Sequence, residues 1–319
     1  MPCYNQSRII GRAIESVVSQ SYPNLQLIVM DDCSRDDSVA VIDSWQRRYP
    51  DKIALYVQPQ NVGHARNMNT GYSLCTGEMI TFCDGDDWYY PDKIRNEVER
   101  LRSSSGYQVC YSNYDFYNES GVLIDHWVDE LRPLPEGDIF VPLYTLDYPQ
   151  NIHLRYEMMP RRALDEVGYY DESIRGWLDW DYRLRLARVY QFGYVPIAGS
   201  AYTLQQLGLT RSLEDLTLLD GWRMVVEKHR DQIERYDNDC QARIARRVDW
   251  QDRLLRQLIR LTRMKGSKLS RLPALVGFLA RYPRCVYEYP FLIDSLFGHR
   301  AQKMILKLRD QFNCVDRIA

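Results

Sequence analysis

Three aspartates within four residues, in the run Asp84-Gly85-Asp86-Asp87, form the strongest chemical feature of this sequence. The run directly follows residues 79–83, an apolar segment typical of a buried strand. Carboxylates held this close repel one another, which raises their pKa values unless a cation neutralises them. A hard divalent cation does this well, and it can in turn hold the phosphates of a nucleotide. The run therefore predicts a site for a divalent cation.

A second acidic pair, Asp31-Asp32, ends another apolar segment, residues 25–30. In an open α/β sheet, ligands bind at the edge formed by the carboxyl ends of the parallel strands. We therefore expect the two acidic clusters to lie at one edge of a common sheet.

The elements that must position these residues alternate along the chain. The pattern predicts helices over about 9–20, 34–49, 63–75 and 91–102, separated by strands over 25–30, 54–58 and 79–83. This alternation is typical of a parallel sheet covered by helices on both faces. Further on it predicts strands over 109–117 and 122–127, a proline-rich loop over 132–150, a helix over 179–190, and an irregular segment to residue 210.

The composition is that of an ordinary soluble globular protein of one or two domains, with 319 residues, 45% of them hydrophobic, and a formal net charge of -2. A nearly neutral balance argues against nucleic-acid binding by the chain as a whole. The eight cysteines show neither a CxxC pair nor another metal-binding spacing. We therefore expect a protein of the reducing cytosol without disulfides.

In their order along the chain, the short motifs resemble those of family 2 glycosyltransferases of the GT-A fold, over roughly residues 1–230. The matching motifs are Pro2-Cys3-Tyr4-Asn5, Gln20-Ser21-Tyr22-Pro23-Asn24, Asp31-Asp32-Cys33-Ser34, Asn61-Val62-Gly63, Ala65-Arg66-Asn67, Gly77-Glu78, Asp84-Gly85-Asp86-Asp87, Tyr169-Tyr170-Asp171-Glu172 and Leu178-Asp179-Trp180-Asp181. A lone Asp-x-Asp arises by chance about once in a chain of this size, whereas the ordered set is specific.

The resemblance implies an α/β fold, with a Rossmann-like, mixed and mainly parallel sheet flanked by helices. It implies a GT-A domain over 1–230, followed by a mainly helical C-terminal extension over 231–319. It also implies that Asp86 binds Mg²⁺ or Mn²⁺, and that Asp84 completes the metal site by binding the ribose or a metal-bound water. Asp32 would accept a hydrogen bond from the imide of a uracil-like base. The remaining residues implied to bind the nucleotide sugar are Pro2, Tyr4, Asn5, Asp31, Asn61, Gly63 and Arg66.

Chemistry also needs a general base that takes the proton of the acceptor hydroxyl. The family usually supplies it from a Glu-Asp pair at a helix start; here Leu178 stands at the Glu position, and the resemblance assigns the base to Asp179. The residues alone leave a second role open for Asp31, Asp87 and Asp179, because each could simply cap a turn or a helix.

Two departures from the family pattern affect these expectations. Only Met1 precedes Pro2, where the family has an apolar strand, so we expect either a late start of the numbering or a shortened first strand. Many relatives carry a metal-binding histidine after the base helix, whereas residues 202–207 contain glutamines and no histidine. A third protein ligand to the metal therefore stays open.

The leading hypothesis is an inverting transferase that moves a sugar from a UDP-sugar, or another nucleotide sugar, to a glycan or lipid-linked acceptor in bacterial-type surface polysaccharide or glycan assembly. The alternative is a catalytically inactive relative that binds nucleotide sugar or scaffolds an assembly; the two departures and Leu178 motivate it. A metal-dependent nucleotidyltransferase would need a Gly-rich phosphate loop with a basic residue near the N-terminus, which the sequence lacks.

The C-terminal third carries a basic segment, with ten Arg and Lys against two Asp between Arg243 and Arg271. A basic amphipathic helix can lie on an anionic membrane, and it can equally be a packed appendix with a solvated basic face. The first reading predicts a cytoplasmic protein in peripheral contact with the inner face of the membrane. The longest uncharged stretch, 189–210, is too interrupted to span a bilayer.

Overall fold

The computed structural model describes residues 1–104, 106–128, 133–148, 154–204 and 215–263. The chain forms two compact units. The first contains Met1–Tyr144 and Leu154–Leu213, and the second contains Thr145–His153 and Glu214–Ala319. The expected domain boundary near residue 230 stays a prediction.

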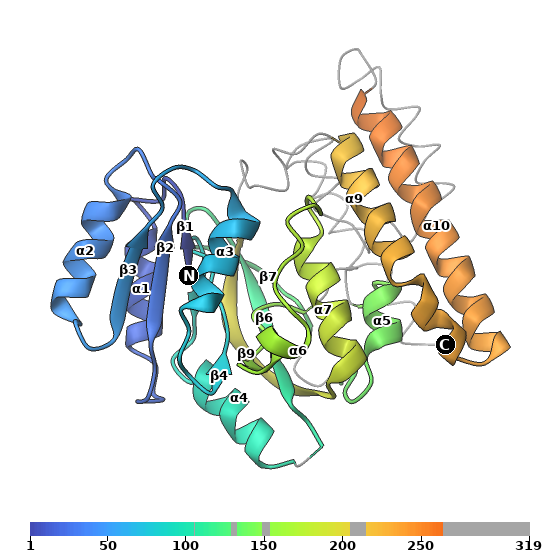
Figure 1. Ribbon diagram of the computed structural model, residues 1–319, viewed down its shortest axis with the longest axis horizontal. Coiled ribbons are helices and arrows are strands. Elements are labelled where there is room, and N and C mark those ends of the chain that lie inside the picture. The colour runs from blue at the N-terminus through green and yellow to red at the C-terminus, as the bar shows by residue number, and fades with distance from the viewer. Residues whose placement is uncertain (105, 129–132, 149–153, 205–214, 264–319) are drawn as a thin grey trace. The chain divides into compact units, whose positions relative to one another are not determined.

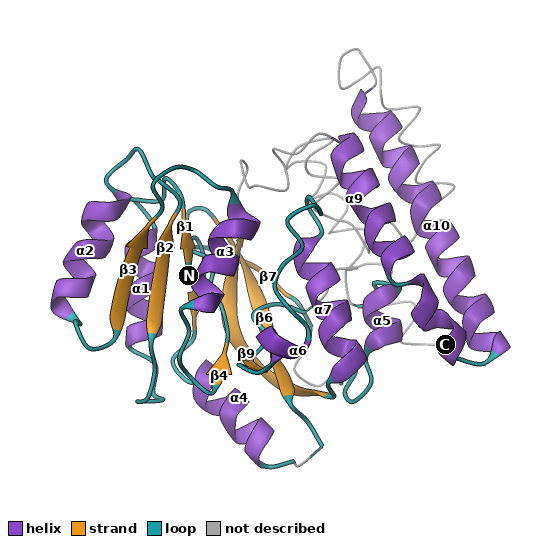
Figure 2. Ribbon diagram, viewed as in Figure 1, coloured by secondary structure: helices purple, strands orange, loops and turns teal. Residues whose placement is uncertain are grey.

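A parallel sheet of three strands opens the first unit, in the order β1-β2-β3. Its strands are β1 (Pro2–Cys3), β2 (Leu27–Asp31) and β3 (Ile53–Val57), and its helices are α1 (Ile10–Val18), α2 (Ser38–Arg48) and α3 (His64–Ser73). Figure 1 and Figure 2 show α1 behind this sheet and α3 in front of it.

Side-chain alternation along β2 explains why helices cover both faces of the sheet. Leu27 and Val29 join the apolar cluster that also holds Ile10 and Ile14 of α1. Met30 points to the other face, where its side chain lies against Gly71 of α3. Every residue of β2 is buried, as expected for a central parallel strand. The predicted alternation of strands and helices is thus confirmed for this half of the unit.

A mixed sheet of four strands completes the first unit, in the order β5-β9-β6-β7. Its strands are β5 (Trp88–Tyr89), β6 (Val109–Asn118), β7 (Leu123–His126) and β9 (Phe192–Leu204), and β6 and β9 run parallel. A separate pair joins β4 (Met79–Ile80) to β8 (Met159–Pro160) in antiparallel register. The remaining helices of the unit are α4 (Lys93–Arg102), α5 (Phe140–Tyr144), α6 (Ala163–Glu166) and α7 (Leu178–Val189).

Three expectations for this region were wrong. The segment expected to be irregular after residue 190 contains the long strand β9, and Pro196 lies where the β6–β9 register shifts, so its missing N–H does not interrupt the ladder. The loop expected over 132–150 contains the short helix α5. The strand expected over 79–83 ends at Ile80.

The second unit contains α9 (Asp215–Lys228), the 3₁₀ helix η2 (Arg230–Arg235) and α10 (Asn238–Arg263). Arg223 and Asp252 join α9 to α10 with an ion pair of 3.0 Å. Two of the basic side chains predicted to form a charged face also pair within α10, Arg253 with Asp249 and Arg256 with Asp252. Residues 264–271 of that basic segment lie outside the described residues. In the part of the chain that the structure describes, no helix is long and apolar enough to cross a membrane.

Candidate active site

The three carboxylates of Asp84, Asp86 and Asp87 converge in the loop between β4 and β5. Each offers an oxygen atom, and these atoms lie within 4.8 Å of one another. Burial raises the pKa of Asp86 to about 6, with Asp84 as the second cause. Burial also raises the pKa of Asp87 well above its usual value, and repulsion from Asp86 and Asp84 adds to this rise. The predicted convergence of negative charge is therefore present in the folded chain.

This donor set fits a divalent cation. Mg²⁺ and Mn²⁺ prefer oxygen ligands, and carboxylates that repel one another gain from a shared cation. Asp87 is the least available of the three, because its Oδ1 accepts the N–H of Thr203 at 2.5 Å and its Oδ2 accepts the hydroxyl of Tyr156. Asp84 and Asp86 are the more accessible pair, and their assignment to the metal stays a prediction.

Gly85 explains how the acidic loop reaches the first strand. A Cβ atom at this position would lie 2.9 Å from the main-chain oxygen of Pro2, 2.8 Å from Ile10 Cδ1 and 2.2 Å from Gln6 Oε1. Only glycine allows such an approach. The loop that holds the carboxylates is therefore in contact with the segment that joins β1 to α1.

That β1–α1 segment is hydrogen-bonded to the turn after β2. Asn5 donates its main-chain N–H to Ser34 Oγ at 2.9 Å and accepts the N–H of Arg35 at 2.8 Å through Oδ1. Asp31 is fully buried and accepts both the N–H and the hydroxyl of Ser34, at 2.8 Å and 2.5 Å. Asp31 therefore caps this turn, the second role that the residues alone left open for it.

Asp32 ties the same turn to the start of α3. Its two carboxylate oxygens accept the main-chain N–H groups of Val62 at 2.7 Å and Gly63 at 3.0 Å. The side chain of Asn61 donates to the main-chain oxygen of Asp32 at 3.2 Å. Gly63 adopts φ 85°, in the left-handed region that glycine tolerates best. The structure thus brings Asp32, Asn61 and Gly63 together.

Other residues predicted to bind the nucleotide sugar lie around this turn, and their side chains differ in solvent exposure. Tyr4 is 43% exposed, and Arg66 is exposed on the first turn of α3, whereas Pro2 is buried in β1. Asn67 is buried and donates to the main-chain oxygen of Met30 at 2.8 Å, so it anchors α3 to β2. Tyr4 and Arg66 are therefore the members of this group with side chains available to a ligand.

The candidate base, Asp179, lies in the first turn of α7 and remains partly exposed, at 32% of its side chain. Arg183, one turn further on, donates to Asp179 Oδ2 at 2.8 Å and to Glu157 Oε2 at 2.9 Å. Arg183 is almost fully buried, so this contact fixes the orientation of the Asp179 carboxylate.

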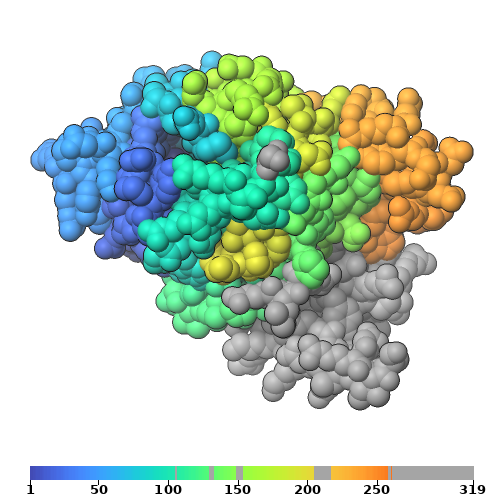
Figure 3. All heavy atoms as spheres, turned by 90° about the horizontal axis from the view of Figure 1, so that it is seen from below, coloured from blue at the N-terminus to red at the C-terminus, as the bar shows by residue number. Residues whose placement is uncertain are grey.

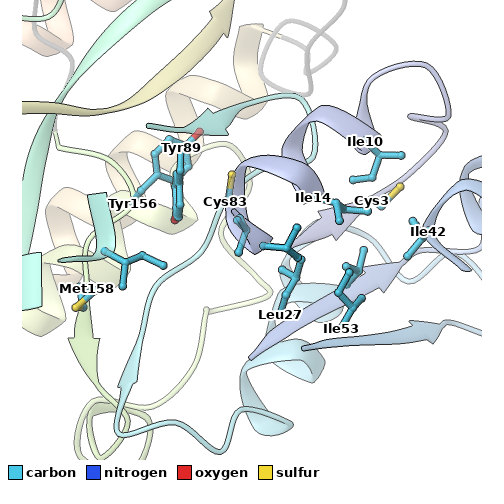
Figure 4. Packing of buried hydrophobic residues seen from close by; sticks show 14 of the residues in the cluster. Cys3, Ile10, Ile14, Leu27, Ile42, Ile53, Cys83, Tyr89, Tyr156 and Met158 are labelled. Atoms are coloured by element: carbon cyan, nitrogen blue, oxygen red, sulfur yellow. The ribbon is translucent and has the colours of Figure 1, made fainter. Parts of the chain in front are cut away.

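Neighbouring residues on one short segment connect the candidate base to the acidic cluster. Tyr156 donates its hydroxyl to Asp87, and the same hydroxyl oxygen lies 3.3 Å from Asp84 Oδ2, while Glu157 holds Arg183, the partner of Asp179. Tyr156 also packs its ring against Tyr89, with centroids 5.9 Å apart (Figure 4). Sequence reasoning missed Tyr156 and Glu157, because both act through contacts distant in the chain and no local motif marks them.

A groove of about 710 Å³ lies elsewhere in the first unit, between α4, residues 133–136 and β9. Figure 3 shows this face, where β9 (yellow) reaches the surface beside α4 (teal). None of the predicted site residues lines the groove. We therefore assign the candidate active site to the acidic loop and its neighbours, not to this groove.

The N-terminal half of the chain is similar to known proteins. Residues 1–156 match the model of a family described as Glycosyl transferase family 2. An uncharacterised glycosyltransferase of Nostoc sp. is 38% identical over 180 residues, which cover 55% of this chain and 54% of that protein. YwdF, an uncharacterised glycosyltransferase of Bacillus subtilis, is 26% identical over 216 residues, 66% of this chain and 75% of that protein. The chain thus spans about half the length of the Nostoc relative. It spans 31% of the length of another uncharacterised glycosyltransferase, from Rickettsia conorii.

Two solved structures share the fold at low sequence identity. TarS 1-349 of S. aureus, in complex with UDP-GlcNAc, has a TM-score of 0.59 and 16% identity over 97% of this chain and 90% of that chain. Mannosyltransferase PcManGT of Pyrobaculum calidifontis, in complex with GDP-Man and Mn²⁺, has a TM-score of 0.58 and 16% identity over 92% of this chain and 84% of that chain. These similarities establish the fold.

Proposed function

This chain belongs to glycosyl transferase family 2 through residues 1–156, and on that premise we propose that it moves a sugar from a nucleotide diphosphate sugar to a hydroxyl acceptor. Its fold is that of the GT-A glycosyltransferases, as the sequence resemblance predicted. The observation that carries the proposal is the convergence of Asp84, Asp86 and Asp87 beside the loop after β1.

The donor is a nucleotide diphosphate sugar, with a UDP-sugar as the first choice. The complexes of TarS with UDP-GlcNAc and of PcManGT with GDP-Man support this class of donor. Asp32, Asn61 and Gly63, together with Tyr4, Asn5 and Arg66, surround the base and ribose. Asp84 and Asp86 would hold Mg²⁺ or Mn²⁺, which when bound would offset negative charge on the departing diphosphate.

Asp179 is the general base in this proposal. It takes the proton of the acceptor hydroxyl as that oxygen attacks the anomeric carbon from the face opposite the diphosphate, which inverts the configuration. The ion pair with Arg183 keeps its carboxylate in one orientation before the acceptor binds. Pro2 helps to position the acidic loop through its main-chain oxygen, which lies against Gly85.

The acceptor is a glycan or lipid-linked sugar, and the pathway is the assembly of a bacterial-type surface polysaccharide or related glycan. We also propose peripheral contact of a cytoplasmic protein with the membrane through the basic C-terminal region. Removing residues 240–319 should then abolish cosedimentation with anionic liposomes. Unchanged cosedimentation of the truncated protein would remove the membrane proposal.

A panel of nucleotide sugars tests the central proposal. We expect release of free nucleoside diphosphate from one donor in the presence of Mn²⁺, with much less release after chelation of the metal. The second candidate, an inactive relative that binds nucleotide sugar as a scaffold, is favoured by Leu178 at the position of the usual Glu. That candidate predicts donor binding without release of nucleotide from any member of the panel.

A further inference from the structure

Two guanidinium groups flank the acidic cluster, each stacked on an aromatic ring. Arg12 of α1 lies 3.7 Å from the ring centroid of Trp88 and donates to the main-chain oxygen of Asp86 at 3.4 Å. Arg155 lies 3.7 Å from the ring centroid of Tyr202. Tyr202 immediately precedes Thr203 in β9, the residue whose N–H binds Asp87. The two arginines therefore belong to the immediate surroundings of the cluster.

Arg155 differs from Arg12 in what its guanidinium contacts. Among the residues that the structure describes, Arg155 forms no ion pair, and its Nε atom is buried without a hydrogen-bond partner. Arg155 as a whole is half-buried, and a cation whose buried N–H group beside an acidic cluster lacks an acceptor is costly unless a ligand completes its contacts.

The charge balance of the site indicates what that ligand is. Three ionised carboxylates and one divalent cation leave a net charge of about −1, which repels a diphosphate. Arg12 and Arg155 bring the balance to about +1, which attracts one. The planar guanidinium also matches the oxygens of a phosphate with two parallel N–H donors.

Two hydrogen bonds of the neighbouring Tyr156 hold the segment that carries Arg155 in place beside the acidic cluster. Its neighbour Tyr156 donates to Asp87 through its hydroxyl, and the main-chain oxygen of Tyr156 accepts from the buried Lys93 at 3.0 Å. The stack on Tyr202 further restricts the guanidinium of Arg155. A charged group held in place before its ligand arrives gives up less entropy on binding.

We propose that Arg155 binds the diphosphate of the donor, with its guanidinium N–H groups donating to the phosphate oxygens. This inference rests on the proposed function and adds a diphosphate-binding residue that no local sequence motif identifies. Arg155 supplies a fixed protein cation on the leaving group.

Binding calorimetry on the full chain tests this role. The wild-type protein is titrated in Mn²⁺ with UDP and GDP, and the tighter nucleotide is compared with its monophosphate. We expect Arg155→Gln to weaken diphosphate binding about 10- to 100-fold, the range of a lost charge-assisted hydrogen bond, and to weaken monophosphate binding less. Binding of Mn²⁺ alone should be unchanged or tighter, because a cation near its ligands has been removed.

Arg162→Gln is the matched control, because Arg162 also lies over a tyrosine ring, at 5.8 Å from the centroid of Tyr190, but pairs with Glu166 at the exposed surface. It should leave all three affinities unchanged. Arg155→Lys keeps the charge without the planar fork and should give an intermediate, diphosphate-selective loss. If Arg155→Gln does not fold, the affinities of Arg155→Lys test the role of Arg155 instead.

The possible results distinguish failure of the inference about Arg155 from failure of the proposed function. Wild-type binding of a nucleoside diphosphate with equally tight binding by Arg155→Gln would overturn the role of Arg155 and leave the proposed function standing. Equal losses for diphosphate, monophosphate and Mn²⁺ would show a structural role and overturn it as well. Failure of the wild-type protein to bind any nucleoside diphosphate would reject the proposed function and, with it, this inference.

Discussion

The hydroxyl of Tyr156 donates to the carboxylate of Asp87, although the two residues stand 69 positions apart in the chain. Tyr156 adopts φ 53°, in the left-handed region that costs a non-glycine residue about 1–2 kcal/mol. The bond to Asp87 and the bond from Lys93 to the Tyr156 main-chain oxygen hold this conformation from two sides. The acidic loop and the segment after residue 154 therefore form one connected structure.

Asp86→Asn should weaken Mn²⁺ binding by at least about tenfold, because the proposed site loses an anionic oxygen ligand. The metal-free variant should also be somewhat more stable than the metal-free wild type, because one member of a repelling group has been removed. Calorimetry with Mn²⁺ and thermal unfolding in a chelator measure the two effects. Asp165→Asn, at an exposed position of α6, is the control and should change neither.

Asp179→Asn should lower the rate of sugar transfer about 10²- to 10⁴-fold, the usual contribution of a general base. Donor affinity should stay within about twofold, because Asn can still accept a hydrogen bond from Arg183. Transfer is followed as release of nucleoside diphosphate in the presence of acceptor, and donor affinity by calorimetry. Transfer at the wild-type rate would exclude Asp179 as the base.

The sequence predicted the elements that depend on local patterns. Helices α1 to α4 and α7 lie where the spacing of apolar residues placed them, and Asp179 lies in the first turn of α7 as expected. The carboxylates of residues 84–87 also converge as their spacing indicated. Such features are decided by near neighbours in the chain.

The features that sequence reasoning missed depend on distant contacts. Asp31 and Asp32 look equivalent in the sequence, yet Asp31 binds Ser34 in its own turn and Asp32 binds the backbone of residues 62–63. Glycine and proline argued against a strand over 192–204, but the shift in the β6–β9 register accommodates Pro196. Arg155 carries no local signal, because its surroundings come from β9 and the acidic loop.

Gly85→Ala should displace the acidic loop from the β1–α1 segment, because the new Cβ would lie 2.9 Å from the main-chain oxygen of Pro2. We expect a loss of Mn²⁺ affinity together with a loss of stability of about 1–3 kcal/mol, typical of overpacking. Gly106→Ala is the control, since its Cβ would meet only Ser104 Oγ, at 3.6 Å. Wild-type affinity and stability in Gly85→Ala would contradict the close packing of this loop.

Lys93→Met should destabilise the fold by about 3–5 kcal/mol, the usual cost of removing one partner of a buried ion pair. Lys93 and Glu97 are both 0% exposed, and the Lys93 Nζ lies 2.7 Å from Glu97 Oε2. Urea unfolding measures the loss. Arg47→Met, which breaks the exposed pair with Asp43, should cost less than about 1 kcal/mol, and similar losses for the two variants would contradict the prediction.

Asp36 should make a small, acid-sensitive contribution to stability. Burial raises its pKa, but hydrogen bonds from Ser38 and Ser7 outweigh burial, and the pKa falls from 3.8 to about 2. The N–H groups of Ser7 and Ser38 each lie 3.0 Å from its carboxylate oxygens, so Asp36 ties the β1–α1 segment to the start of α2.

The sign of this effect follows from the lowered pKa. The unfolded chain takes up a proton at Asp36 at a higher pH than the folded chain does, so the stability from the ionised carboxylate is full well above pH 3.8 and is lost as the pH falls through 3.8 to about 2. Because the side chain is exposed, we expect less than about 1 kcal/mol. The difference in unfolding free energy between wild type and Asp36→Asn should therefore shrink from about pH 5 downward. A difference that grows on acidification would contradict the assignment of these hydrogen bonds to the ionised carboxylate.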